Sequence, residues 1–83
     1  MNNVRLSIPL EKVKTDAFLI IPDGPNWREN IRQPTTWNAA VREAKELSKN
    51  FKCVRILAGL KEEIDEYTKG FTVIAEIGKC KIK

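Results

Sequence analysis

The sequence predicts an α+β fold, a two-layer sandwich in which a four-stranded, mostly antiparallel or mixed sheet packs against two helices. Short stretches that alternate apolar and polar residues have the period of two expected of half-buried strands. One longer stretch, residues 36–50, repeats apolar residues at the spacing of an amphipathic helix. Glycines and prolines separate these stretches, so the expected order is β-β-α-β-α-β within one domain that spans residues 1–83.

The first two strands are expected in the N-terminal quarter of the chain. Apolar and polar residues alternate over residues 4–10, and Pro9, which has no N–H to donate, favours an edge position. Residues 17–21 are continuously apolar, which is typical of a strand that is covered on both faces or placed centrally. The polar link between these stretches is long enough for the two strands to pair with each other in antiparallel fashion.

An irregular segment and the main helix follow. Residues 22–35 contain three prolines and an Asp-Gly pair without consistent periodicity, which predicts a loop. Within residues 36–50 one face of the helix is apolar, and threonines just before it supply a hydroxyl cap for its first N–H groups. This apolar stripe consists of Trp37, Ala40, Val41, Ala44 and Leu47, with Phe51 at the next step.

The C-terminal part is expected to contain a strand, a second helix and a final strand. Residues 52–58 predict a strand that turns Val54, Ile56 and Ala58 to one face, and residues 60–69 predict the helix, which Gly70 ends. The short links leave open a parallel, right-handed return to the strand over residues 71–77. The alternation slips by one residue at Gly78, which indicates a β-bulge or bend there, or a turn into a terminal extension.

The composition limits the cellular compartment in which the protein is expected and the metal and cofactor sites that it can form. Residues 17–21 are the longest apolar run, far shorter than the roughly 20 residues of a membrane span, and a cytoplasmic location is therefore expected. Reducing conditions there favour two free thiols at Cys53 and Cys80. The chain has no histidine and no Cys-x-x-Cys pair, so no metal site and no cofactor are expected.

The same composition predicts a protein that is not an enzyme. Histidine, the commonest general base, does not occur, and neither a phosphate-binding glycine loop nor a nucleophile elbow is present in the sequence. Glu62 and Glu66 share a face of the second predicted helix, where a solvated flank is a simpler interpretation than a cation site. No catalytic residue is therefore assigned.

The sequence instead favours a small protein-interaction module, a stand-alone regulator or inhibitor of a larger protein. Trp27 and Arg28 lie in the proline-stiffened loop, and Trp and Arg are frequent interface anchors. Alternatively, Trp27 folds back as a lid over the core. The candidate partner-binding residues are Trp27, Arg28, Arg32, Arg55, Lys79 and Lys81.

Two further interaction modes follow from the sequence. An exposed edge on the first strand would allow a homodimer. In the alternative function, nucleic-acid binding, the same basic residues contact phosphates, and Trp27, Tyr67 or Phe18 stacks on bases. The net charge of +4 is spread along the chain, whereas a dedicated duplex binder usually concentrates its bases.

Overall fold

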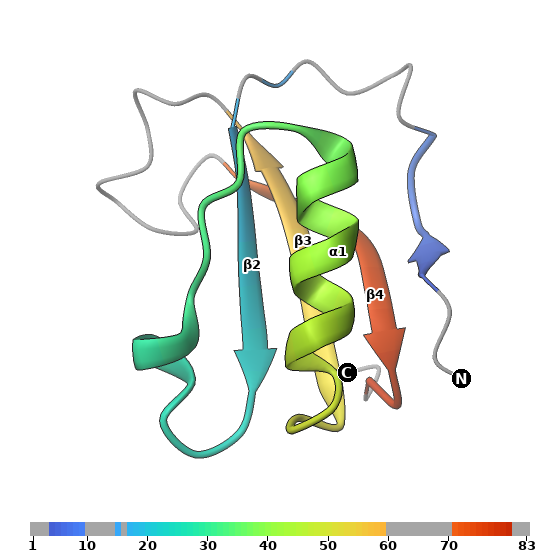
Figure 1. Ribbon diagram of the computed structural model, residues 1–83. Coiled ribbons are helices and arrows are strands. Elements are labelled where there is room, and N and C mark those ends of the chain that lie inside the picture. Colours follow the sequence, from blue (N-terminus) through green and yellow to red (C-terminus); the bar gives the residue numbers. More distant parts are fainter. Residues whose placement is uncertain (1–3, 10–14, 16, 60–70, 81–83) are drawn as a thin grey trace.

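The computed structural model describes residues 4–9, 15, 17–59 and 71–80. Within them the chain forms four strands, one α-helix and one 3-10 turn, an α+β arrangement (Figure 1). In chain order these elements are β1 (Arg5–Leu6), β2 (Ala17–Asp23), η2 (Trp27–Asn30), α1 (Trp37–Leu47), β3 (Cys53–Gly59) and β4 (Thr72–Gly78). The second predicted helix, over residues 60–69, lies outside the described residues. No helix of the described part is long and apolar enough to cross a membrane.

The four strands form one sheet in the order β1-β4-β3-β2, and every neighbouring pair is antiparallel. The antiparallel pairing of the first two strands, which their link would allow, does not occur, because β1 pairs with β4 and lies at the opposite edge from β2. A parallel return from β3 to β4 is also excluded. Residues 60–71 separate these strands, which is near the lower limit of a parallel crossover, whereas antiparallel neighbours accept links of any length.

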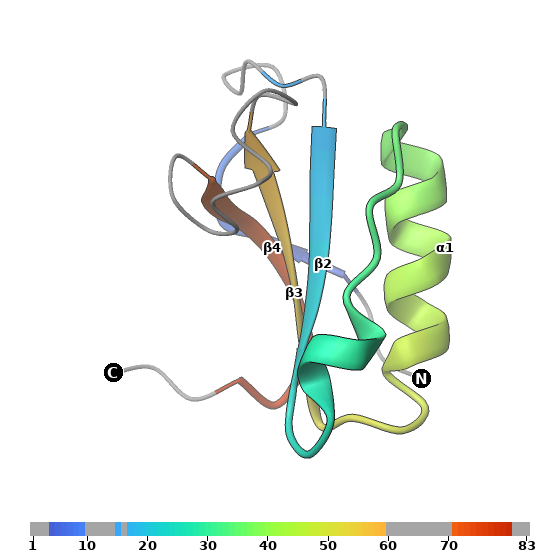
Figure 2. The ribbon, with the colours of Figure 1, turned by 90° about the vertical axis from the view of Figure 1, so that its left-hand side faces the viewer.

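The helix α1 covers one face of the sheet (Figure 2). Thr36 is its N-cap, with a side-chain oxygen that accepts a hydrogen bond from the Ala39 N–H at 3.2 Å, as the sequence predicts. The apolar stripe, apart from Val41, belongs to one core cluster with residues of β2, β3 and β4, and Trp37 meets the Phe18 ring with centroids 6.0 Å apart. The buried residues of this core are Phe18, Ile20, Ala40, Ala44, Leu47, Val54, Ile56, Ala58, Ile74, Ala75 and Ile77.

The other face of the sheet also buries apolar side chains. Leu19 and Leu57 are 0% and 4% exposed there, in a second cluster with Ala17 and Phe71. Residues on both faces of β2 are thus buried, as its continuous apolar run predicts, although β2 is an edge strand. Its outer edge is covered, because Ile20 exchanges two backbone hydrogen bonds with Arg32, at 2.9 and 3.1 Å.

Two alternation patterns differ from the sequence prediction. In β4 the register shifts so that Ile56 pairs with Ala75 and Leu57 with Val73, and Ile74 is the extra residue of a bulge. Val73 therefore joins the second cluster while Ala75 faces α1. In the N-terminal stretch, only two residues form β1, and Leu6 is 52% exposed instead of facing the core.

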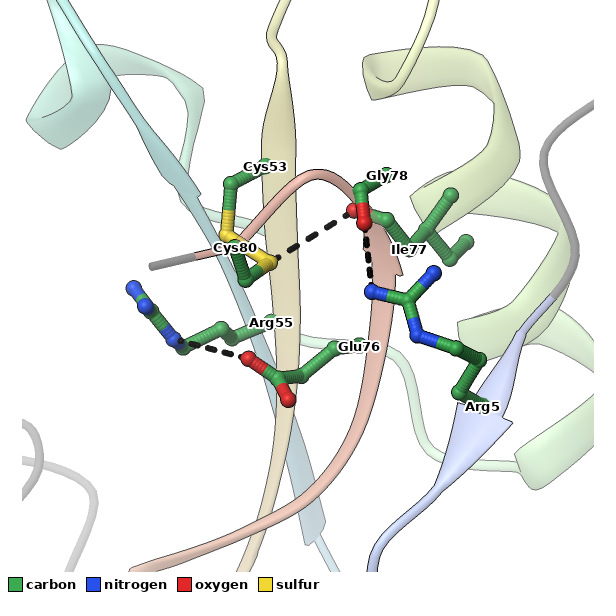
Figure 3. Close-up of a disulfide and its surroundings, with 7 residues drawn as sticks. All are labelled: Arg5, Cys53, Arg55, Glu76, Ile77, Gly78 and Cys80. Atoms are coloured by element: carbon green, nitrogen blue, oxygen red, sulfur yellow. Dashed lines mark hydrogen bonds and ion pairs between the residues drawn. A yellow bond between two sulfur atoms is a disulfide. The ribbon is translucent and has the colours of Figure 1, made fainter. Parts of the chain in front are cut away.

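A disulfide between Cys53 and Cys80 lies at the end of the sheet where β3 begins and β4 ends (Figure 3). The expectation of two reduced thiols is therefore wrong in this structure, because it rested on the compartment and took no account of geometry. Gly78 ends β4 with φ at +87°, which confirms the bend predicted at this glycine. The bend brings Cys80 back across β3, with 4.9 Å between the two Cα atoms.

Candidate functional site

A surface pocket of about 590 Å³ lies where the C-terminal end of α1, the link to β3 and the end of β4 come together. Arg5 reaches it from the edge strand β1, so the pocket draws on three parts of the chain that are far apart in sequence. Four of its lining residues are basic and none is acidic. The lining residues are Arg5, Ser48, Lys49, Asn50, Phe51, Lys52, Gly78 and Lys79.

Backbone contacts hold the basic segments against one another. The Lys79 N–H donates to the Lys52 carbonyl at 2.8 Å, which fixes the end of β4 beside the start of β3. The Arg5 guanidinium donates to the Gly78 carbonyl (Figure 3). The Cα of Gly78 lies close to the Lys52 carbonyl. A Cβ added to Gly78 would lie 2.2 Å from that carbonyl oxygen. The pocket therefore has a defined backbone frame.

The electrostatics of this frame favour an anion. Among the described residues, no carboxylate forms an ion pair with Arg5, Lys49, Lys52 or Lys79. Four cations around one pocket repel one another, and an anionic group bound between them relieves that repulsion. Phosphate suits this set, because lysines bind it as point charges and an arginine can contact it with two N–H groups.

An alternative role for these lysines is to stabilise the C-terminal end of α1, since cations near a helix C-terminus offset the helix dipole. The last four carbonyls of α1, those of residues 44–47, already accept hydrogen bonds from the chain itself. Their donors are Ser48, Lys49, Asn50 and Phe51, through backbone N–H groups and the Ser48 hydroxyl, at 2.7–3.2 Å. The lysine ammonium groups are therefore not needed to satisfy these carbonyls, and they are free to contact a ligand.

The turn η2, which carries Trp27, lies at the same end of the sheet as the C-terminal end of α1 and the end of β4 (Figure 1), whose residues line the pocket. Trp27 is 37% exposed and belongs to neither core cluster, which does not support the lid interpretation. The Arg28 guanidinium lies over its ring, 5.1 Å from the centroid, in a cation–π contact. A Cβ at Gly24 would lie 3.2 Å from the Phe51 ring, so the loop before this turn reaches the pocket wall.

The structure separates the other predicted site residues from this surface. Arg32 pairs with Glu43 of α1 at 3.6 Å, and Arg55 pairs with Glu76 at 3.4 Å on the sheet (Figure 3). Both guanidinium groups are thus partly neutralised by carboxylates within the fold. Phe18 is 7% exposed and is not available for stacking. Two other candidates, Lys81 and Tyr67, lie outside the described residues.

Cys53, Glu76 and Cys80 form a cluster of potential metal ligands whose donor atoms lie within 4.8 Å of one another. The two sulfur atoms are bonded to each other, and the carboxylate is paired with the cationic Arg55. A disulfide sulfur has no thiolate charge to offer a metal ion, and the guanidinium opposes a second cation. We therefore assign no metal site to this cluster.

Three of the four pocket cations, Arg5, Lys49 and Lys52, were not among the residues expected from the sequence. Arg5 alternates with apolar residues in a strand pattern, and Lys49 belongs to the polar face of a helix, so neither has a distinctive local signal. Lys52 does have a local sequence signal that it shares with Lys79, because each of these two lysines directly precedes a cysteine. Comparisons with protein-family models, with curated proteins and with solved structures find no match.

Proposed function

We propose that this chain is a non-enzymatic protein that binds single-stranded nucleic acid by its backbone phosphates. The supporting observation is the pocket in which Arg5, Lys49, Lys52 and Lys79 gather and which no acidic residue lines. The dispersed charge of the sequence argued against such a function, and folding removes that objection by collecting four bases at one end of the molecule. Phosphate contacts supply most of the affinity of proteins that bind nucleic acid without sequence preference.

A single strand fits this surface better than a duplex does. Small single-strand binders combine a basic groove for the backbone with aromatic side chains on which bases stack. Trp27 provides one exposed aromatic ring at the same end of the sheet, with Arg28 already placed over it. A base that replaces or joins this guanidinium on the ring would lie at the end of the sheet where the phosphates bind.

The test is a fluorescence-anisotropy titration of a labelled single-stranded oligonucleotide at several salt concentrations. Four phosphate contacts predict a slope of about −2.8 in a plot of log K against log salt, at about −0.7 for each contact. The double variant Lys49→Gln, Lys52→Gln should bind more weakly, with a slope near −1.4. The matched control is Arg42→Gln, Lys45→Gln, which removes two charges from the exposed side of α1 and should leave the slope unchanged. Equal losses in the two double variants would contradict the proposal.

A protein partner is the second candidate, and the exposed Trp27–Arg28 pair is the observation that favours it. Aromatic and arginine side chains of this kind anchor protein interfaces. Such a module would act as a regulator or inhibitor of a larger protein, and the outer edge of β1 would offer a homodimer contact. Copurification with and without nuclease separates the two functions. A stoichiometric protein band that survives nuclease and moderate salt, together with no oligonucleotide binding, would favour this second candidate.

A further inference from the structure

The disulfide and the basic pocket use residues that are neighbours in the sequence. Two Lys-Cys dipeptides occur in the chain, Lys52-Cys53 and Lys79-Cys80. The lysines of both line the pocket, and the cysteines of both form the disulfide. One covalent bond therefore joins the two segments whose lysines lie next to each other in the pocket wall.

We propose that the Cys53–Cys80 disulfide positions Lys79 in the pocket, so that the redox state of this bond sets the affinity for nucleic-acid phosphates. This inference rests on the proposed function. Cys53 and Cys80 are positioning residues in this scheme, because neither needs to touch the ligand. The oxidised chain is the form with high affinity and the reduced chain is the form with low affinity.

The geometry supports this role because the chain has few other ties beyond β4. Gly78 is the last residue of the strand, and its positive φ turns the backbone out of the regular ladder. Within the described residues, a single backbone hydrogen bond, from the Lys79 N–H to the Lys52 carbonyl, holds the chain after that point, and the disulfide follows one residue later. A single hydrogen bond contributes little alone, whereas the disulfide restricts the position of the whole segment.

The two cysteines also differ in access, which suggests how the bond opens. Cys53 is 3% exposed, whereas Cys80 lies half-buried at the surface. A dithiol reductant would attack the Cys80 sulfur and expel the Cys53 thiolate, which takes up a proton. Its second thiol then releases the Cys80 thiolate, which is also protonated, and the reductant leaves as a disulfide. The two electrons thus come from the dithiol, and the protein ends with two thiols.

The experiment compares the oxidised full chain with the same chain reduced by a dithiol, at a temperature where circular dichroism shows the reduced chain folded. The probe is a labelled single-stranded oligonucleotide of about 12 nucleotides, within the usual site size of about 4–16. Reduction should raise Kd by about five- to tenfold and make the salt slope shallower by about 0.7, the contribution of one phosphate contact.

Single substitutions show whether the effect passes through Lys79. Lys79→Gln should bind with the reduced-state affinity in both redox states, because it lacks the side chain that the disulfide positions. Lys49→Gln should bind more weakly in both states but should keep the full redox response. Lys45→Gln, outside the pocket, should keep both the affinity and the response.

The outcomes are distinct. Equal affinities and slopes in the two redox states would overturn the inference while leaving the proposed function intact. An undiminished redox response in Lys79→Gln would also overturn it, because loosening would then act on the whole pocket. A reduced chain that is unfolded at every temperature would assign the disulfide to folding alone. Failure of the oligonucleotide to bind either form would contradict the proposed function itself.

Discussion

At the scale of single residues, Gly78 has the most demanding position in the described chain. Its φ of +87° lies in the region that L side chains rarely adopt, and its side faces the Lys52 carbonyl oxygen. That oxygen belongs to the backbone, so it cannot move away as a flexible side chain would. Gly78 therefore couples the bend at the end of β4 to the frame of the pocket.

We expect Gly78→Ala to lower the free energy of unfolding by about 2 kcal/mol or more, from the left-handed backbone and the close contact together. Urea denaturation followed by circular dichroism measures this loss. Lys79→Ala, one residue further on and exposed, should cost less than about 0.5 kcal/mol and is the control. A similar stability for both variants would mean that the backbone relaxes at Gly78.

The two tryptophans should differ in the same kind of measurement. Trp37 packs against the core and the Phe18 ring, so Trp37→Ala should cost about 3 kcal/mol, the low end for removing a large aromatic side chain. Trp27→Ala should change the unfolding free energy by less than about 1 kcal/mol and weaken partner binding instead. A fall of many degrees in the melting temperature of Trp27→Ala would restore the lid interpretation.

At the scale of elements, three local features shape the fold: a helix cap, a covered strand edge and a β-bulge. The helix begins where the Thr36 side chain accepts the Ala39 N–H, and β2 is protected where Arg32 bonds to its outer edge. The bulge at Ile74 divides β4 into a part that faces α1 and a part that faces the second cluster. These local devices decide which side chains reach each core.

The N-cap provides a prediction for the helix. Thr36→Ala should lower the free energy of unfolding by about 1 kcal/mol, because the Ala39 N–H then has no side-chain acceptor. Thr35→Ala is the matched control, since Thr35 is also exposed and forms no side-chain hydrogen bond. Thermal denaturation of both variants measures the difference. Equal melting temperatures would show that water replaces the cap without cost.

At the scale of the whole molecule, the disulfide links parts of a small domain that has a limited core. The bond closes a loop with a sequence separation of 27 residues. Loss of the bond enlarges the conformational freedom of the unfolded chain and so lowers the stability of the fold. Disulfides persist in oxidising surroundings. In the cytoplasm that the sequence predicts, the bond would therefore be open to reduction.

Reduction should lower the free energy of unfolding by about 3.5 kcal/mol, the loop-entropy value for a separation of 27 residues. Urea unfolding with and without a dithiol reductant measures this change. The double variant Cys53→Ser, Cys80→Ser should unfold at a lower urea concentration and should not respond to the reductant. An unchanged midpoint for the reduced wild-type chain would contradict this estimate.

Local sequence patterns determined the elements, because hydrophobic periodicity and capping depend on neighbouring residues. The Thr36 cap, the facing of Val54, Ile56 and Ala58, and the bend at Gly78 were predicted correctly. The stripe of α1 was also correct except at Val41, which does not belong to the core cluster. The pairing of β1 with β4 and the bulge at Ile74 were not predicted. Each of these depends on which strand lies alongside, and the competing pairings satisfy the same local patterns.

The candidate site was decided by tertiary structure to a greater extent than the fold. The sequence identified Trp27 and Arg28 from their loop and Lys79 from the basic C-terminal end. It did not bring Arg5, Lys49 and Lys52 together, because charge clustering depends on distances through space and these residues are separated along the chain. The Cys53–Cys80 bond was missed for the same reason, because the two cysteines are far apart in the sequence and close only in the folded chain. Periodicity acts over a few residues, whereas the pocket and its disulfide exist only once the antiparallel sheet has brought distant segments into contact.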